Sequence, residues 1–160
     1  MTARSAHGTN AEGQPFACRE PSVKLTRAYR DEIIAHARAD APNECCGIIA
    51  GNCGAATKLY RAVNAAASPY RYEVDPKDLF RISKEIDSSG WEIFAIYHSH
   101  LATAARPSPT DIKLAYYPEA YYLLVSLGDR DKPDVSPDNP DLRAYRIIDG
   151  VVTEEAIEIV

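Results

Sequence analysis

The hydrophobic and polar positions divide the chain into a start without a pattern and a long series of helix and strand patterns. Residues 1–21 are rich in Ala, Gly, Ser, Thr, Asn and Pro and have no hydrophobic period, which predicts a disordered tail. Val23–Leu25 can start a strand, and Thr26 can cap a helix that continues to about Asp40. Residues 22–160 are therefore expected to form one folded domain.

Apolar, β-favouring runs between turn residues predict further strands in the first half of this domain. They are Cys45–Ala50, Lys58–Asn64 and Tyr70–Val74. Asp75 and Pro76 have the pattern of a helix N-cap followed by the first helical residue, and the apolar period after them ends at Gly90. The first half is thus expected to mix strands and helices.

The second half adds a strand that leads to a pair of histidines, a short helix and three more strands. These elements are strand Glu92–Tyr97, a helix from Pro109 to about Tyr116, and strands Ala120–Leu127, Arg143–Ile148 and Val151–Ile159. Gly128–Pro140 is expected to be a solvent-exposed loop, and Asp149-Gly150 predicts a two-residue hairpin. Strands outnumber helices, so the predicted fold class is an α/β sandwich with a mixed, mostly antiparallel sheet flanked by helices.

Composition and charge narrow the classes of function. At 160 residues the chain fits one domain that can bury a core without disulfides. A net charge of -5 and the lack of a basic run argue against nucleic-acid binding. Because no apolar run approaches the roughly 20 residues that span a bilayer, and no signal-peptide pattern is present, we expect a cytoplasmic protein without a membrane partner. Reduced thiols are expected at Cys18, Cys45, Cys46 and Cys53.

The strongest chemical pattern is the segment His98-Ser99-His100. Histidines two residues apart at a strand end project to one side of the strand, and the serine between them projects to the other. A carboxylate at Asp111, brought back by the intervening loop, would complete a two-histidine, one-carboxylate set that suits zinc and leaves a fourth position open for water. An open position indicates catalysis rather than a structural metal.

Both parts of this pattern also have simpler interpretations. A His-x-His pair on a strand is often an exposed pair without a metal. Ser108-Pro-Thr-Asp111 has the pattern of a capping box, with Ser108 at the N-cap. A further carboxylate, Glu44, lies directly before a strand that is expected to be buried. A carboxylate in such a place is costly unless it has a hydrogen-bond partner or a functional role. Its simpler interpretation is an exposed loop glutamate.

A set of spaced residues resembles the motif of the JAMM (MPN-plus) metallopeptidase family: Glu44, His98-Ser99-His100, a gap of seven residues, Ser108 and, three positions later, Asp111. The resemblance extends from about Val23 to the C-terminus. The stretches Tyr97–Ala115 and Arg143–Gly150 are similar, more narrowly, to the actinobacterial peptidases of Mec type within this family. Leu101 departs from the pattern, because many eukaryotic members have proline there, and this leaves the shape of the following loop open.

The resemblance implies both a site and a substrate. It implies that Zn²⁺ is held by His98, His100 and Asp111, that Glu44 is the general base, and that Ser108 stabilises the tetrahedral oxyanion. Mec-type peptidases release cysteine from the C-terminus of a ubiquitin-like sulfur-carrier protein, and the family's substrates commonly end in Gly-Gly. Such a tail is expected to bind as an added strand at a sheet edge. An exposed thiol and open sheet edges are compatible with a homodimer.

Two other classes of function remain open. A cupin-type non-haem iron oxygenase also uses His-x-His with a carboxylate, although the glycine and downstream histidine context of a cupin is missing. A non-catalytic MPN scaffold would be expected to lose ligand residues, whereas this chain has the full set. A zinc deaminase is disfavoured, because its Pro-Cys-x-x-Cys pattern is absent.

Residues outside the motif have simpler structural interpretations. Cys45 and Cys46 are expected to be buried small residues, and Cys53 an exposed thiol in a turn. Half-buried packing, with a substrate surface as the alternative, is expected for the tyrosines Tyr116, Tyr117, Tyr121 and Tyr122. His36 is expected at the surface or an interface, and His7 belongs to the tail.

Overall fold

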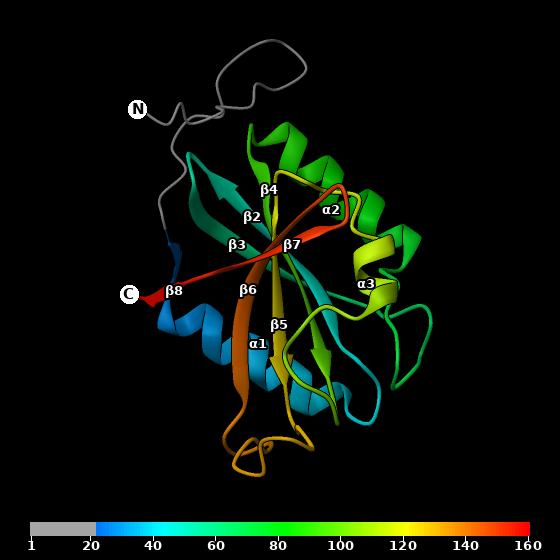
Figure 1. Cartoon of the computed structure of the whole chain (residues 1–160). Coiled ribbons are helices and arrows are strands. Elements are labelled where there is room, and N and C mark those ends of the chain that lie inside the picture. The colour runs from blue at the N-terminus through cyan, green and yellow to red at the C-terminus, as the bar shows by residue number, and fades with distance from the viewer. Residues whose placement is uncertain (1–21) are drawn as a thin grey trace.

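The structure is a computed structural model that describes residues 22–160. The predicted tail of residues 1–21, together with Cys18 and His7, lies outside the described residues. Within the described part, a mixed sheet of six strands runs in the order β3-β2-β4-β5-β6-β7 (Figure 1). The strands are β2 Cys46–Asn52, β3 Ala55–Ala62, β4 Glu92–His100, β5 Tyr121–Ser126, β6 Asp141–Ile148 and β7 Val151–Glu155. Only β4 and β5 pair in parallel within this sheet, so the predicted mixed, mostly antiparallel sheet is confirmed.

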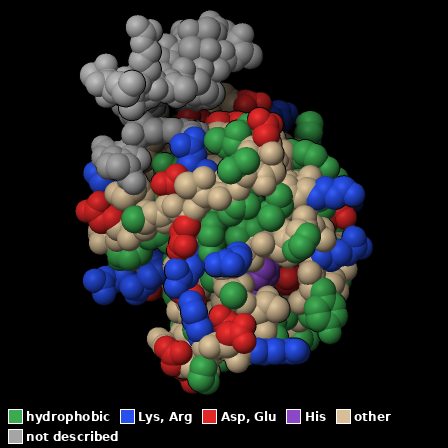
Figure 2. All heavy atoms as spheres, in the orientation of Figure 1, with side chains coloured by type: hydrophobic (Ala, Val, Ile, Leu, Met, Phe, Trp, Pro, Cys, Tyr) green, Lys and Arg blue, Asp and Glu red, His purple; other side chains and the backbone are tan. Residues whose placement is uncertain are grey.

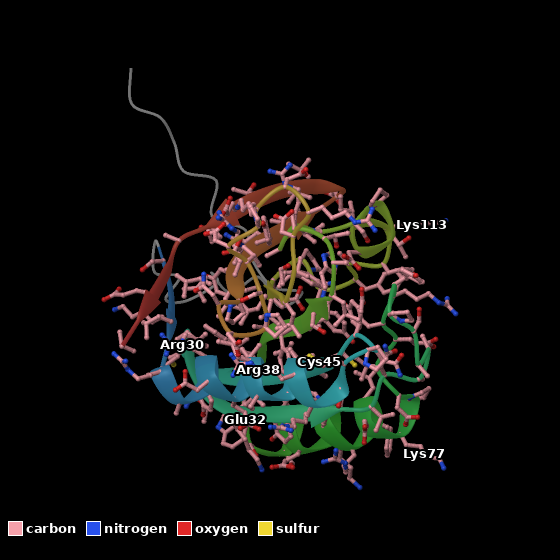
Figure 3. The ribbon with its side chains drawn as sticks, turned by 90° about the horizontal axis from the view of Figure 1, so that it is seen from below. Arg30, Glu32, Arg38, Cys45, Lys77 and Lys113 are labelled. Carbon is pink, nitrogen blue, oxygen red and sulfur yellow. The ribbon has the colours of Figure 1, made fainter. Side chains whose placement is uncertain are left out.

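Helices cover the two faces of the sheet. Helix α1 (Arg27–Asp40) packs through Ile33 and Ala37 against the face that carries Tyr97. Helix α2 (Pro76–Ser88) packs on the opposite face, and the short helix α3 (Pro109–Lys113) lies near it in Figure 1. In Figure 3, the labelled residues Arg30, Glu32 and Arg38 lie along α1, whereas Lys77 of α2 and Lys113 of α3 lie at the right of the view.

Local sequence signals begin and end α1 and α2 where they were expected. Thr26 caps α1 by accepting a hydrogen bond from the Tyr29 backbone, and Asp75 caps α2 by accepting from two backbone amides of its first turn. Gly90, with a φ of 69°, follows the end of α2. Helix α3 is shorter than predicted: it ends at Lys113 rather than near Tyr116, with Leu114 as its C-cap.

The predicted strand Val151–Ile159 is wrong as a single element. It breaks at Ala156, after which β8 (Ile157–Ile159) leaves the large sheet and pairs in parallel with β1 (Val23–Leu25). Val23 and Leu25 are fully buried there. Pairing with the buried strand β1 therefore stabilises β8 at a position away from β6, the partner of β7 in the hairpin. The hairpin itself is as predicted, since Asp149 and Gly150 both have positive φ, as a tight two-residue turn requires.

The predicted strand Tyr70–Val74 is also wrong. This segment is irregular and is joined to the chain before it by an isolated bridge between Asn64 and Val74. The Asn64 side chain takes the place of a ladder: its amide nitrogen donates to Arg71 O (3.1 Å), and its oxygen accepts from Glu73 N (3.0 Å). A polar side chain thus satisfies backbone groups that a strand would pair with another strand.

Within the described part, none of the helices is both long and apolar enough to cross a bilayer.

Candidate metal centre

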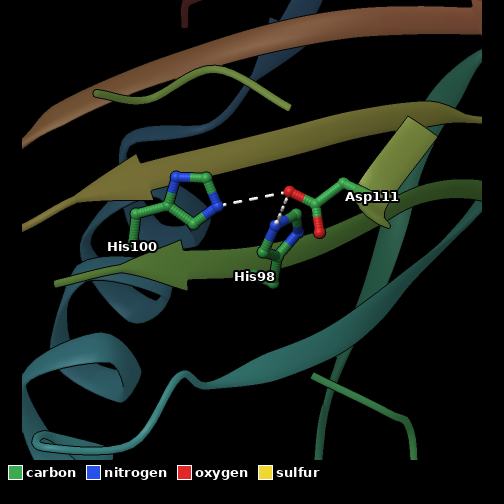
Figure 4. Close-up of side chains that lie close together, drawn as sticks. All are labelled: His98, His100 and Asp111. Carbon is green, nitrogen blue, oxygen red and sulfur yellow. Dashed lines mark hydrogen bonds and ion pairs between the residues drawn. The ribbon is translucent and has the colours of Figure 1, made fainter. Parts of the chain in front are cut away.

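Three side chains from two elements converge on one point of the sheet face covered by α2 and α3. His98 and His100 project from the end of β4 to the same face, and Asp111 projects from the first turn of α3 (Figure 4). His98 Nε2 lies 3.1 Å from Asp111 Oδ2, and His100 Nε2 lies 3.2 Å from the same oxygen. One donor atom from each residue lies within 4.8 Å of the other two. The three residues expected at the metal are therefore brought together.

Helix capping determines where the Asp111 carboxylate lies. Ser108 Oγ accepts from Asp111 N (3.1 Å), and Asp111 Oδ2 accepts from Ser108 N (2.8 Å), which is a complete capping box. The same Oδ2 atom faces both histidines. The capping-box interpretation of this tetrapeptide is thus correct, and the same cap fixes the carboxylate at the histidines and places the Ser108 hydroxyl beside it.

The two imidazoles are oriented by different means. His100 Nδ1 lies 2.9 Å from Ala104 O, which leaves Nε2 to face Asp111, as is common for metal-binding histidines. His98 Nδ1 has no hydrogen-bond partner among the described residues. Its ring is held instead by Tyr72, which stacks on it with ring centroids 4.2 Å apart. Tyr72 is a site residue that sequence reasoning missed, since no spacing rule connects it with His98.

Ser99 lies on the face of the sheet opposite to the histidines and stabilises the strands that carry them. Its hydroxyl accepts a hydrogen bond from Cys45 N (2.8 Å), and it faces away from the histidines, as its place between them predicts. This bond ties the start of β2 to the end of β4. It acts on the strands that carry the site rather than on a ligand atom.

Glu44 lies next to the histidines because β2 and β4 are antiparallel. Cys46 pairs with His98, so the chain just before β2 runs beside His100. Glu44 is 3% exposed, and its Oε2 atom has no hydrogen-bond partner among the described residues. Burial raises the pKa of its carboxyl group to about 8, and the nearby His100 opposes this rise. The burial of Glu44 excludes the simple interpretation of an exposed loop glutamate. A buried carboxyl group without a hydrogen-bond partner costs stability.

Burial and hydrogen bonds shift the pKa values of the three converging groups in different directions. Burial disfavours the Asp111 carboxylate, yet hydrogen bonds with His100 and His98 hold its pKa below the usual range. Burial lowers the pKa of His98. For His100 burial acts in the same direction, but the bonds to Asp111 and Ala104 raise its pKa overall. Two imidazoles and a carboxylate are a donor set that zinc takes in catalytic sites with an open position.

An apolar pocket of about 300 Å³ adjoins Asp111 on the side of α2. We call it the apolar pocket, because most of its lining residues are apolar or aromatic: Ile48, Tyr72, Val74, Pro76, Leu79, Ile96, Leu114, Tyr116, Tyr117 and Tyr122. Its polar lining residues are Arg71, Glu73, Thr110 and Asp111. Three of the four clustered tyrosines thus line a cavity, as a substrate surface would require, whereas Tyr121 packs against Phe94 on the other face. Figure 2 shows a histidine side chain at the surface, with apolar side chains and Lys or Arg side chains near it.

Other sequence expectations have mixed outcomes. His36 is not at the surface: it is 3% exposed, and its Nδ1 lies 2.7 Å from the Tyr97 hydroxyl. The helical period places His36 on the buried face of α1, together with Ile33 and Ala37. Cys45 and Cys46 are buried and Cys53 is exposed, as predicted, and these three thiols are free.

Comparisons with known proteins agree with this geometry. Residues 26–148 match the family model for prokaryotic homologs of the JAB domain. The chain is 41% identical to a CysO-cysteine peptidase of Mycobacterium tuberculosis over 80% of this chain and 84% of that protein. It is 38% identical to a desampylase of Haloferax volcanii over 68% and 83%. A solution structure of a Desulfitobacterium hafniense protein has a TM-score of 0.71 and 33% identity, and the match covers 86% of this chain and 92% of that one. The chain therefore belongs to the family of prokaryotic homologs of the JAB domain, as its resemblance to the JAMM metallopeptidases predicted.

Proposed function

We propose that the protein is a zinc-dependent peptidase that hydrolyses the bond after the C-terminal tail of a ubiquitin-like sulfur-carrier protein and releases cysteine. The observation that carries this proposal is the convergence of His98, His100 and Asp111 beside the buried, unpaired carboxyl group of Glu44. The names of two relatives, CysO-cysteine peptidase and desampylase, support a peptidase. In the proposed substrate, the tail ends in Gly-Gly before the cysteine.

In this proposal His98 Nε2, His100 Nε2 and Asp111 Oδ2 hold the zinc ion. A bound zinc ion supplies a Lewis acid and lowers the pKa of its water to about 7. The protein fixes the three donors through the capping box, through Ala104 and through the stacked ring of Tyr72. A fourth position then remains for water.

Glu44 is proposed as the general base. Its buried Oε2 atom takes a proton from the attacking water and passes it to the leaving amine, a role for which a raised carboxyl pKa is suited. Ser108 is proposed as the oxyanion donor. Its Oγ already accepts from Asp111 N, so its O–H remains to donate to the developing negative charge on the scissile carbonyl oxygen.

The carrier tail is proposed to cross the face of the sheet rather than to extend an edge of it. β4 is an interior strand, paired with β2 on one side and β5 on the other, so an added strand cannot form beside the histidines. This differs from the expected edge-strand mode. The apolar pocket next to Asp111 offers the tail a cavity for side chains that precede the glycines.

The alternative functions fit less well. A cupin oxygenase would require a barrel, whereas the described residues form an open sheet with helices on both faces. A non-catalytic scaffold would not need Glu44, which is buried without a hydrogen-bond partner among the described residues and lowers the stability of the fold.

The test is a cleavage assay with carrier proteins extended by one cysteine. We expect cysteine release by the zinc-loaded protein, loss of release with a chelator, and recovery on addition of zinc but not of magnesium. Carriers for cysteine, thiamine and molybdenum-cofactor synthesis, assayed in parallel, identify the preferred partner. Turnover that requires iron and oxygen, or no release from any carrier by zinc-loaded protein, would reject the proposal.

A further inference from the structure

Arg106 lies in the loop between the second histidine and Ser108, and its backbone is tied directly to the site. The carbonyl oxygen of Ala104 accepts from Arg106 N (2.8 Å) and also lies 2.9 Å from His100 Nδ1. Two residues further on, Ser108 begins the capping box that holds Asp111. Arg106 is therefore fixed between the residues that orient two of the three proposed ligands.

The loop that carries Arg106 is anchored to the sheet. Ala105 is buried against Leu124 and Tyr145, and the Tyr145 hydroxyl donates to Ala105 O. Pro107 is buried as well, whereas Arg106 between these two residues is exposed. An exposed cationic side chain on an anchored backbone can bind a ligand without first ordering the loop, which lowers the entropic cost of binding.

The charge of Arg106 is not neutralised within the described part of the chain. Among residues 22–160 its guanidinium group has no hydrogen bond or ion pair. The nearby Arg143 on β6 differs, since it is bound to Asp141 (3.0 Å) and Glu154 (2.8 Å). The Arg106 guanidinium group is therefore available to an anionic ligand, on a loop whose backbone is tied to the metal centre.

Arg106 and the apolar pocket lie on different sides of the metal centre. The pocket adjoins Asp111 and is walled by Tyr72 and α2 residues, whereas Arg106 belongs to the loop that covers β5 and β6 beyond His100. On one side of the scissile bond, a substrate that crosses the metal centre would meet a mainly apolar lining in which Arg71 and Glu73 carry opposite charges. On the other side it would meet Arg106, whose charge is not balanced in this way. The pocket suits the longer acyl part, which leaves the arginine for the leaving group.

We infer that Arg106 binds the free α-carboxylate of the single amino acid that leaves, and so selects C-terminal amino acids over isopeptide-linked partners. This inference rests on the proposed function. Hydrolysis breaks the C–N bond, the water oxygen stays on the carrier carboxyl group, and its proton goes to the amine of the released amino acid. The guanidinium group holds the other end of that amino acid by charge-assisted hydrogen bonds, for which its planar fork is suited.

The test compares two substrates that differ only at the leaving group: a carrier that ends in cysteine with a free carboxylate, and the same carrier that ends in cysteine amide. The wild-type zinc-loaded protein should cleave the acid with a kcat/KM at least about 10-fold higher, as expected for a lost bond to a charged group. Arg106→Ala should abolish this preference, mainly through a higher KM for the acid, and should leave cleavage of the amide nearly unchanged. Arg106→Lys should restore part of it.

The matched control is Arg27→Ala. Arg27 is an exposed arginine on α1, on the opposite face of the sheet, and this variant should keep the wild-type ratio of acid to amide cleavage. Equal cleavage of acid and amide by the wild type, or an equal loss of both in Arg106→Ala, would overturn the inference while the peptidase function stands. Absence of cleavage of either substrate by the wild type would overturn the peptidase function, and the inference with it.

Discussion

Asn64 joins the two parts of the site that come from different segments of the chain. Its side-chain nitrogen donates to Glu44 O (3.0 Å) and to Arg71 O (3.1 Å), so it links the backbone of the proposed base to the segment that carries Tyr72. Its side-chain oxygen accepts from Ala66 N and Glu73 N. One buried amide thus satisfies four backbone groups, none of which lies in a regular element.

Replacement of Asn64 by alanine should therefore disturb both stability and activity. Loss of these buried hydrogen bonds should lower the free energy of unfolding by about 2–3 kcal/mol, because the released backbone groups stay partly buried. The kcat should fall because Glu44 and the Tyr72 ring lose their positions, while one zinc ion still binds. Asn139→Ala, in the exposed loop before β6, is the control and should change neither. Wild-type kcat in Asn64→Ala would contradict a positioning role.

Glu44 predicts a characteristic dependence of stability on pH in the metal-free protein. Its pKa is about 8 in the folded state and about 4.3 in an unfolded chain. Between these values the folded state binds more protons than the unfolded state, so this group lowers stability as the pH rises from about 4.3 to about 8.

Glu44→Gln removes this loss of stability. The variant should melt close to wild type near pH 5 and several degrees higher at pH 8, since about 1 kcal/mol shifts the melting temperature of a domain of this size by about 2–4 °C. Glu92→Gln, at an exposed position at the start of β4, should show no such trend. Equal melting temperatures of Glu44→Gln and wild type across this range would contradict the buried carboxyl group.

The sequence predicts those site residues that lie close together along the chain. His98, His100, Ser108 and Asp111 fall within one strand end, one loop and one helix cap, so strand and cap geometry alone predict that they can meet. Tyr72 and Asn64 could not be found in this way. Their roles depend on a non-local stacking contact and on an irregular segment whose backbone is held by one side chain.

At the scale of elements, the pairing of β2 with β4 determines where the site residues lie. One glycine, Gly47, leaves the space that this pairing requires. Gly47 lies opposite Tyr97 in this pair, and a Cβ atom there would lie 2.2 Å from the Tyr97 ring. The ring has no room to move, because its hydroxyl is bonded to the buried His36. Tyr97 directly precedes His98, so a displaced ring would also shift the first proposed ligand.

Two glycine-to-alanine variants separate packing from backbone strain. Gly47→Ala should destabilise the protein by about 1–3 kcal/mol or more through overpacking and should also lower zinc affinity. At Gly150, with a φ of 77° and open space around it, alanine should cost about 1 kcal/mol and leave zinc affinity unchanged. Melting curves and competitive zinc titrations measure both effects. Unchanged zinc affinity in Gly47→Ala would show that β4 tolerates the shift.

Errors in the predicted elements occur where tertiary contacts override local pattern. The alternation of Val151–Ile159 is continuous, but the last strand pairs with β1, more than 130 residues earlier in the chain. Tyr70–Val74 has strand-forming residues, yet Tyr72 turns toward His98 instead of joining a ladder. Elements with caps or tight turns, such as α2 and the hairpin at Asp149-Gly150, were predicted correctly because their signals are local.

For the whole molecule, β1 and β8 join the beginning and the end of the described chain. We propose that residues 22–160 form one catalytic domain. A variant that starts at Ser22 should then keep wild-type stability and activity. A variant that ends at Glu155 should lose on the order of 2–4 kcal/mol, because Val23 and Leu25 lose the cover of Ile157 and Ile159. Loss of activity in the first variant, or full stability in the second, would contradict this division.

The most direct measurement is single-turnover cysteine release by zinc-loaded Glu44→Gln beside the wild type, with the zinc content of both proteins determined in the same samples. We predict one zinc ion per chain in each protein and a rate for the variant that is about 10²–10⁴-fold lower, because the substituted amide would leave His98, His100 and Asp111 intact but could not move the proton. Equal rates at equal zinc content would contradict a base at this position, and with it the proposed mechanism of hydrolysis.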